Sequence, residues 1–242
     1  MMRSGNPVLK SDKVFLREGS FSSERAMTIN GTVNKTYFLL LLTVATSIWS
    51  WSHLELYSIL IVTGLIGGLI TAIITIFKKS LSGYTAPIYA LFEGLFLGAI
   101  SAMVEQTYPG IVMQAVLLTF GTLFCLLTAY KSRLIKVTEN FRLGVVAATG
   151  AILIIYLFTF VMGFFGMSMP YIHESGLIGI GFSLVVIIIA SLNLVLDFDF
   201  IEKGAEAKAP KYMEWYGAFG LMVTLIWLYI EILRLLAKLR DR

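Results

Sequence analysis

The sequence predicts an all-α fold: a polytopic membrane protein built as a bundle of seven transmembrane helices. Its composition is the first reason, because 57% of the 242 residues are hydrophobic and only 14% are charged. Soluble domains carry about a quarter charged residues. The second reason is a series of long apolar runs, and the third is the confinement of basic residues to alternate connecting segments. A water-soluble core of this size cannot hide so much apolar surface, so its apolar solvent must be lipid.

Each of the charge-poor runs has about the 17 to 25 residues that a helix needs to cross a hydrocarbon core. The runs cover residues 36–52, 56–77, 85–104, 108–130, 143–166, 176–196 and 215–237. No charged residue lies between Glu105 and Lys131, or between Arg142 and Glu174. The first run is the weakest, because it is short and ends near Trp49 in an aromatic segment typical of a membrane interface.

The chain begins with a polar segment of mixed charge, residues 1–35. This segment lacks the basic and then apolar start of a cleavable signal peptide. We expect it to be a flexible cytoplasmic tail, and residues 36–242 to form one seven-helix transmembrane domain. The first span then serves as an uncleaved signal anchor.

The Lys and Arg residues predict the orientation in the membrane. Fifteen of the 19 lie in the N-terminal segment and in the second, fourth and sixth loops, whereas the first, third and fifth loops hold none. The fifteen are Arg3, Lys10, Lys13, Arg17, Arg25, Lys35, Lys78, Lys79, Lys131, Arg133, Lys136, Arg142, Lys203, Lys208 and Lys211. Cytoplasmic segments carry such an excess, so the N-terminus is predicted to be cytoplasmic.

The remaining basic residues are Arg234, Lys238, Arg240 and Arg242, at the C-terminus. An odd number of spans would place them outside, against the same rule. Either the tail is tolerated there, or the last segment re-enters and returns to the cytoplasm. Seven full spans are favoured, because the earlier helices usually set the orientation.

Several classes of site are excluded. The pI near 9.1 does not indicate nucleic-acid binding, since the basic residues form short clusters between apolar runs. Cys125 is the only cysteine, which excludes an intrachain disulfide and a cysteine-based metal site. His53 and His173 fall in loops and are interpreted as interfacial residues, not metal ligands. No cofactor is predicted.

Function in a membrane protein usually resides where an ionisable group is kept despite its cost. Glu93, Asp197, Asp199 and Glu231 lie within or at the ends of apolar runs, and Glu214 lies at the entrance to the last run. No Lys or Arg lies in the middle of any run to neutralise them. Buried carboxylates without cations tend to share protons or bind a cation, so the sequence predicts an acid-lined path for cations or protons.

Glu93 lies near the middle of the third run, beside a Gly-x-x-x-Gly pair formed by Gly94 and Gly98. Such a pair permits close helix contact. Glu93 is therefore either a functional acid or an acid that holds the bundle together through a hydrogen bond. The pair Gly64 and Gly68 in the second run is interpreted as helix packing.

Asp197 and Asp199 end the sixth run, and residues two apart on a helix point about 200° apart. They therefore cannot both face one site. Asp197, one turn after Asn193, is predicted to face the bundle, and Asp199 to form a surface ion pair with Lys203. The alternative for both acids is a solvated helix end.

Glu231 has Arg234 three residues on, and Glu214 follows Lys211 by three residues. Local ion pairs are thus the structural alternative to a functional role for both acids. Ser183 follows two glycines in a way that suggests an intramembrane serine protease. No histidine lies in any run to act as its base, so an enzyme is not predicted.

At these residues the sequence resembles the Bax inhibitor-1 family, specifically its bacterial YccA-like branch. The resemblance runs from about residue 35 to the end. Its most telling parts are Glu93-Gly94-Leu95, the segment from Asp197 to Lys203, and Leu228-Tyr229-Ile230-Glu231.

This resemblance implies a bacterial inner-membrane protein with seven helices, the last of them central, and a pH-sensitive calcium leak. It also implies that acids on the last two helices form a proton-sensitive pair that gates the pore. Asp197 matches the first position, and Glu231 the second with glutamate in place of aspartate. Since Glu231 lies about 25 Å along the helix from Glu214, Asp197 meets either Glu214 or Glu231. The second run lacks the arginine that would lock such a pair.

The sequence therefore predicts a membrane protein that leaks cations, calcium above all, in a pH-dependent way. The alternative is a non-conducting protein that binds and regulates other membrane proteins, such as a membrane protease. An intramembrane enzyme built on Ser183 is the least favoured class.

Overall fold

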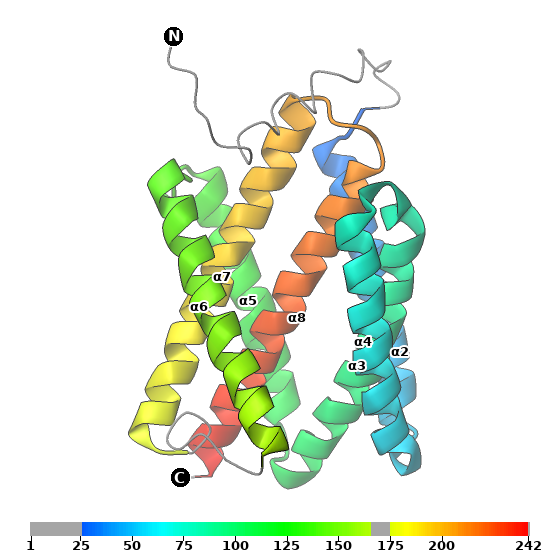
Figure 1. Cartoon of the computed structure of the whole chain (residues 1–242), viewed down its shortest axis with the longest axis vertical. Coiled ribbons are helices and arrows are strands. Elements are labelled where there is room, and N and C mark those ends of the chain that lie inside the picture. The colour runs from blue at the N-terminus through cyan, green and yellow to red at the C-terminus, as the bar shows by residue number, and fades with distance from the viewer. Residues whose placement is uncertain (1–25, 166–174, 242) are drawn as a thin grey trace.

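The computed structural model describes residues 26–165 and 175–241. Within them the chain folds into α-helices joined by short loops and two 3₁₀ turns (Figure 1). The helices are α2 (Ile29–Trp51), α3 (Tyr57–Phe77), α4 (Ser82–Thr107), α5 (Ile111–Lys131), α6 (Glu139–Phe164), α7 (Leu177–Glu206) and α8 (Met213–Arg240), and the turns are η3 (Leu54–Leu56) and η4 (Lys79–Leu81). The all-α prediction is confirmed. The predicted tail over residues 1–25, His173 and Arg242 fall outside the described residues.

The last helix, α8, is the centre of the bundle and packs against α2, α4, α5 and α7. The loops at residues 78–81, 132–138 and 207–212 lie at one end, here called the basic end, which is uppermost in Figure 1. The loop at residues 108–110 and the end of α8 lie at the opposite end. Alternate loops thus do lie at opposite ends of the bundle, as the charge pattern predicts.

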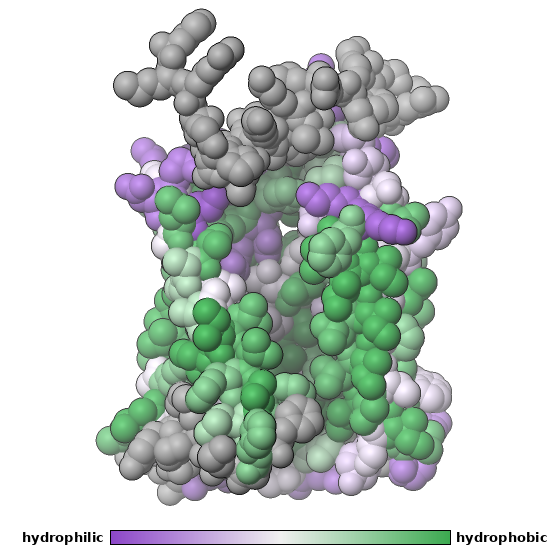
Figure 2. Space-filling model, viewed as in Figure 1, coloured by the Kyte–Doolittle hydropathy of each residue, from purple (hydrophilic) through white to green (hydrophobic). Residues whose placement is uncertain are grey.

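In the part of the chain that the structure describes, six helices are long and apolar enough to cross a membrane: α3 to α8. The first helix, α2, is 23 residues long but is not among them. The reason is that its buried face is largely polar, carrying Thr32, Thr36, Thr43 and Ser50 beside Leu39, while most of its other large apolar side chains are exposed. Figure 2 shows the largely apolar exterior that these helices present along most of the bundle.

The first helix begins earlier than predicted. Thr28 caps it by accepting a hydrogen bond from the Gly31 amide at 3.0 Å, so residues 29–35 are helical and not part of a tail. The polar composition of this segment favoured a tail over a helix in the sequence-based prediction. In the structure, polar side chains of the segment form contacts with other helices. Lys35, for example, forms an ion pair with Glu214 of α8.

The last helix is one continuous element that ends opposite the basic end, so the described residues show no re-entry. Its basic residues have partners there. The Lys238 ammonium donates to the Gly179 carbonyl at 3.0 Å, Arg240 donates to the Pro109 carbonyl at 3.2 Å, and Arg234 pairs with Glu231 at 3.3 Å. Charges bound in this way explain how a basic C-terminus is accommodated at this end.

Helices α2 and α4 meet along a seam of small residues. The Ser47 hydroxyl donates to the Gly94 carbonyl at 3.0 Å, and the Ser50 hydroxyl donates to the Leu95 carbonyl at 2.7 Å. A Cβ added at Gly94 or Gly98 would overlap backbone atoms of α2. The prediction that this glycine pair permits close helix contact is therefore confirmed.

Helix α6 is attached to the bundle by polar contacts spaced seven residues apart on one of its faces. Arg142 pairs with Asp199 of α7 at 2.7 Å, and the Asn193 amide of α7 donates to the Thr149 hydroxyl at 2.7 Å. The Tyr156 hydroxyl donates to Glu231 of α8 at 2.8 Å. Seven residues are about two helical turns, so these contacts form one stripe down the helix.

Candidate functional site

A hollow divides the face of the molecule seen in Figure 2. Helices α6 and α7 lie on one side of it, α3 and α4 lie on the other, and α8 passes between them (Figure 1). We call this hollow the central cleft. On α8, a stripe of residues is partly or fully exposed although most of their neighbours are buried: Tyr216, Gly220, Val223, Trp227, Ile230 and Arg234. These residues recur at helical spacing, so α8 presents one face to the cleft.

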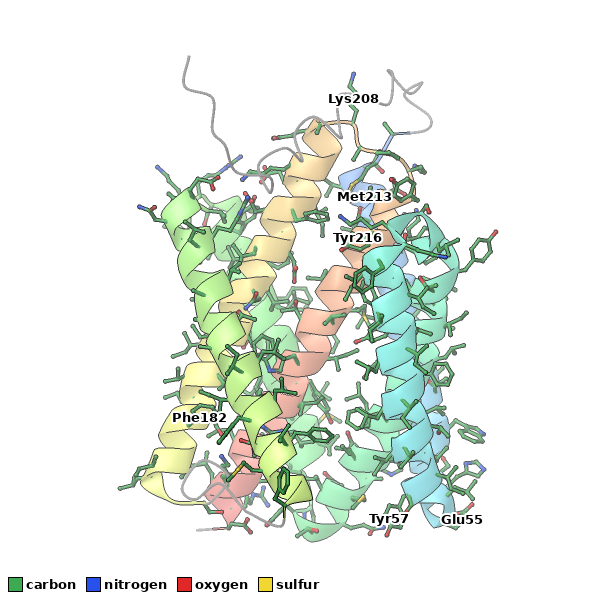
Figure 3. The ribbon with its side chains drawn as sticks, in the orientation of Figure 1. Glu55, Tyr57, Phe182, Lys208, Met213 and Tyr216 are labelled. Carbon is green, nitrogen blue, oxygen red and sulfur yellow. The ribbon has the colours of Figure 1, made fainter. Side chains whose placement is uncertain are left out.

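Tyr216 marks the cleft at its basic end, where its ring lies between the two sides (Figure 3). The Lys79 ammonium lies 5.1 Å from the centre of this ring, and the ring of Phe200 of α7 lies 6.0 Å away. Lys79 follows α3, so residues from both walls of the cleft converge on one α8 side chain.

Asp197 lies on the α7 wall and faces α8, as predicted. Its Oδ1 atom lies 3.8 Å from where a Cβ on Gly220 would stand, and its carboxylate interacts with the Thr224 hydroxyl. Its other oxygen, Oδ2, is buried and is the only such side-chain nitrogen or oxygen without a hydrogen-bond partner in residues 26–165 and 175–241. A buried acceptor left without a donor is costly, so it marks a place where a proton or a cation fits.

Glu93 lies on the opposite wall, on α4, one helical turn after Tyr89, and its carboxylate is directed at α3. Ser82 and Tyr89, seven residues apart, lie on the face of α4 that meets α8. The Ser82 hydroxyl donates to the Tyr212 carbonyl at 2.9 Å, and the Tyr89 ring packs on Phe219 at 5.0 Å.

Gly68 of α3 provides the space that the Glu93 carboxylate occupies, because a Cβ there would stand 2.7 Å from Oε1. Gly64, one turn earlier, instead meets the α4 backbone, since its added Cβ would stand 2.7 Å from the Phe92 carbonyl oxygen. Of the two glycines interpreted as packing residues, Gly64 thus serves helix contact and Gly68 accommodates the acid.

The two acids lie at the same depth in the bundle. Helices α4 and α8 run in the same direction, since Ser82 contacts Tyr212 at one end and Ser101 hydrogen-bonds Tyr229 at 2.7 Å further along. This offset places Glu93 opposite residues 221–223 of α8. Asp197 lies beside residues 220 and 224 of the same helix. Val223, whose side chain is 37% exposed, lies at the same level on the cleft face of α8.

Asp199 is neutralised by cations and does not face Asp197's site. Its predicted partner Lys203 lies 2.8 Å away, and Arg142 of α6 lies 2.7 Å away. The predicted surface ion pair is correct in its partner but wrong in its exposure, because Asp199 is buried. Arg142 covers it from a neighbouring helix, which the local sequence cannot indicate.

Glu214 is fully buried and fully partnered. It accepts hydrogen bonds from the Thr28 amide and hydroxyl, both at 2.9 Å, and pairs with Lys211 at 3.0 Å and with Lys35. Gly31 of α2 leaves room for this carboxylate, since a Cβ there would overlap it. The Lys211 pair is as predicted. Glu214 thus fixes the start of α2 to the start of α8.

Glu231 is also buried and partnered. It accepts from the Tyr156 hydroxyl and pairs with Arg234, its predicted partner. Arg234 in turn donates to the Tyr156 oxygen at 3.1 Å and lies over the Tyr156 ring. Because Arg234 is on the cleft face of α8, this cluster lies in line with the cleft, about 16 Å beyond Val223.

The predicted pairing of Asp197 with Glu214 or Glu231 is wrong. Asp197 meets α8 at residues 220 and 224, which lie about 9 Å along the helix from Glu214 and about 10 Å from Glu231. Each of those acids has cationic partners of its own. The acid that shares the depth of Asp197 is Glu93.

Lys238 is a buried lysine that the sequence pattern did not predict. The Lys238 ammonium donates to the Ser183 hydroxyl at 3.0 Å, and both residues are buried. Ser183 therefore has a basic neighbour after all, although no histidine is near it in the described residues. The burial of Lys238 could have been predicted from its spacing of seven residues from Glu231, which places both on one face of α8.

The described residues contain no cluster of three or more His, Cys, Asp and Glu side chains arranged to hold a metal ion. The cleft instead offers two separate carboxylates with the Thr224 and Tyr89 hydroxyls beside them. Oxygen donors of this kind suit hard cations such as Ca²⁺. A site with so few ligands suits an ion in transit more than a resident one.

Comparison with known proteins agrees with this architecture. No curated protein and no solved structure matches the chain. A family model described as Bax inhibitor 1 like matches residues 6–241, which covers nearly the whole sequence. The chain belongs to the Bax inhibitor 1 like family.

Proposed function

We propose that this protein is a pH-sensitive cation leak, with calcium as its ion, in which Asp197 and Glu93 bind the passing cation in the central cleft. The observation that carries the proposal is the buried, unpartnered Oδ2 atom of Asp197. The other acids inside the bundle have cationic partners, whereas neither Asp197 nor Glu93 forms an ion pair among the described residues. A cation or a proton is what such a pair of acids lacks.

The same chemistry supplies the pH sensitivity. A carboxylate must be deprotonated to bind a cation, so protons and calcium compete for Asp197 and Glu93. Raising the pH favours the cation, and lowering it favours the proton. The N-terminus and the basic end are proposed to face the cytoplasm of a bacterial inner membrane, with α2 as the seventh span.

The cluster at the far end of the cleft is proposed to close the path. Arg234 lies on the cleft face of α8, so its positive charge opposes a cation that moves along this face. Glu231, 3.3 Å from Arg234, partly neutralises that charge and so lowers the electrostatic barrier to the passing cation. Glu231 therefore acts on conduction through Arg234 and not by holding the ion, whereas Glu214 and Asp199 serve the fold.

Calcium flux into liposomes that contain the purified protein tests the proposal, measured from mildly acidic to mildly alkaline pH. The wild type is expected to conduct with a flux that varies with pH. Asp197→Asn removes that dependence and Glu93→Gln reduces it, because each amide keeps the shape of the side chain without its titration. Glu206→Gln, an exposed acid at the end of α7, is the matched control and leaves the profile unchanged.

Absence of flux above that of empty liposomes would reject the leak. A non-conducting protein that binds and regulates other membrane proteins would then be the better function, and capture of such a partner would survive Asp197→Asn. We propose no enzymatic activity and no cofactor. The Ser183 and Lys238 pair is assigned to helix packing, so Ser183→Ala is expected to leave the calcium flux unchanged.

A further inference from the structure

A second hollow lies away from the central cleft, between α2 and α5, at the end of the bundle opposite the basic end. It has a volume of about 570 Å³. Its rim is exposed, with Val44 and Ile48 on α2 and Met113 on α5, whereas its floor is buried, with Leu97 on α4 and Met222 on α8. The hollow is therefore a groove that opens sideways toward the surroundings of the helices, and we call it the lateral groove.

The hydroxyl groups that line the lateral groove already form hydrogen bonds within the protein. Each hydroxyl is already bonded to a helix carbonyl or to another hydroxyl at 2.7 to 3.2 Å. The residues are Thr43, Ser47, Ser52, Ser101, Thr119 and Tyr229. No charged side chain lines the groove. A ligand that needs hydrogen bonds or a counter-charge would lose them on entry, so the groove suits a hydrocarbon.

The dimensions point to one hydrocarbon chain. The lining runs along α2 from Leu40 to Ser52, which is about 18 Å of helix. One leaflet of a bilayer has about half of the roughly 30 Å hydrocarbon core, so this length fits a single leaflet.

An acyl chain is apolar along its whole length and needs no hydrogen-bond partner, so it suits a groove of this length and lining. A helix of a partner or of a second copy of this chain is the competing occupant, which the tests below distinguish.

We infer that the lateral groove binds one acyl chain of a phospholipid from the leaflet opposite the basic end. The groove ends at Trp51 and Ser52, where α2 ends, so the headgroup of such a lipid would lie beyond Trp51. Trp side chains are enriched at this level of a membrane. The bound chain fills the gap between α2 and α5 and completes the bundle on this side.

Photo-crosslinking tests this inference without any substitution. The wild-type protein is placed in bilayers of phosphatidylcholine that carries a diazirine within one acyl chain, and the labelled peptides are identified by mass spectrometry. Labelling is expected to concentrate on residues 40–52 and 112–120. Even labelling over all exposed apolar helices, including α6, would overturn the inference.

Native mass spectrometry of the detergent-solubilised protein gives a second test. The wild type is expected to retain one phospholipid that withstands delipidation, and Val116→Trp, which fills the groove, is expected to lose it. Leu117→Trp is the matched control, since Leu117 is 64% exposed and does not line the groove, and it keeps the lipid. Equal retention by the two variants would reject the site, as would a dimer that forms in the wild type and is lost with Val116→Trp.

Discussion

Glu93 on α4 and Asp197 on α7 lie at the same depth in the bundle, at the level of Val223 on α8. Two acids at one level of an apolar bundle, neither of them paired with a cation in the described residues, are an unusual arrangement in a membrane protein. Helix packing alone does not explain why the protein keeps two acids at a position where burying them costs free energy. Their shared level gives the cleft a definite place at which a cation would bind.

Calcium should stabilise the protein in a pH-dependent way. A ligand that binds only the folded state raises its stability, by about 2.7 kcal/mol at a concentration 100 times its Kd. Because Asp197 and Glu93 must be deprotonated to bind, calcium is expected to raise the Tm at alkaline pH and to have no effect at acidic pH. Thermal unfolding in detergent measures this shift. Asp197→Asn should abolish it and Glu206→Gln should not; a shift of equal size at both pH values would contradict the site.

Substitutions at Arg234 and Glu231 should change flux in opposite directions. Arg234→Gln removes a positive charge from the cleft face and is expected to raise calcium flux severalfold. Glu231→Gln leaves that charge unbalanced and is expected to lower flux. Tyr156→Phe keeps the aromatic ring and both charges, so it is the matched control with a small effect. Liposome flux measures all three; a decrease with both Arg234→Gln and Glu231→Gln would show a structural role instead.

Glu214→Gln should destabilise the fold without altering calcium stabilisation. Removing one member of a buried ion pair costs about 3 kcal/mol, because the Lys35 ammonium, 19% exposed, loses its partner. Lys211→Gln is the control, since Lys211 is 50% exposed and its pair is worth less than about 1 kcal/mol. Equilibrium unfolding measures both values. Equal losses from the two variants would mean that Lys211, and not Lys35, anchors this junction.

The glycines of the α2–α4 seam should be far less tolerant than other helical glycines. Gly98→Ala places a Cβ against the Ser47 backbone, which cannot yield, and overpacking of this kind costs about 1 to 3 kcal/mol. Gly121→Ala and Gly150→Ala meet nothing within 4 Å and should be neutral or stabilising by about 0.5 to 1 kcal/mol. Unfolding measurements on the three variants compare them directly. A neutral Gly98→Ala would show that the helices separate easily here.

Local ion pairs could be predicted from the sequence, whereas distant ones could not. Lys203, Lys211 and Arg234 lie three or four residues from their acids, a spacing that a helix brings together wherever it lies. Their second partners, such as Arg142 for Asp199, come from other helices. Which helix lies beside which, and at what offset, depends on packing that periodicity does not encode.

The same limit explains the wrong acid pair. The spacing of Asp197 on its helix indicated that it faces the bundle, and it does. Its depth relative to Glu93 depends on the offset between α4 and α8, which the contact of Ser82 with Tyr212 fixes. No local pattern in the sequence contains that offset.

The largely polar buried face of α2 affects how this helix is inserted into the membrane. A helix that buries threonine and serine and exposes its apolar residues is only weakly hydrophobic as a segment, so a translocon recognises it poorly on its own. Three of its hydroxyls, those of Thr43, Ser47 and Ser50, donate to carbonyls of α4. Stable insertion of α2 should therefore depend on the synthesis of α4, which starts about thirty residues after α2 ends. Helix α2 would then reach its final position only after helices that follow it in the chain.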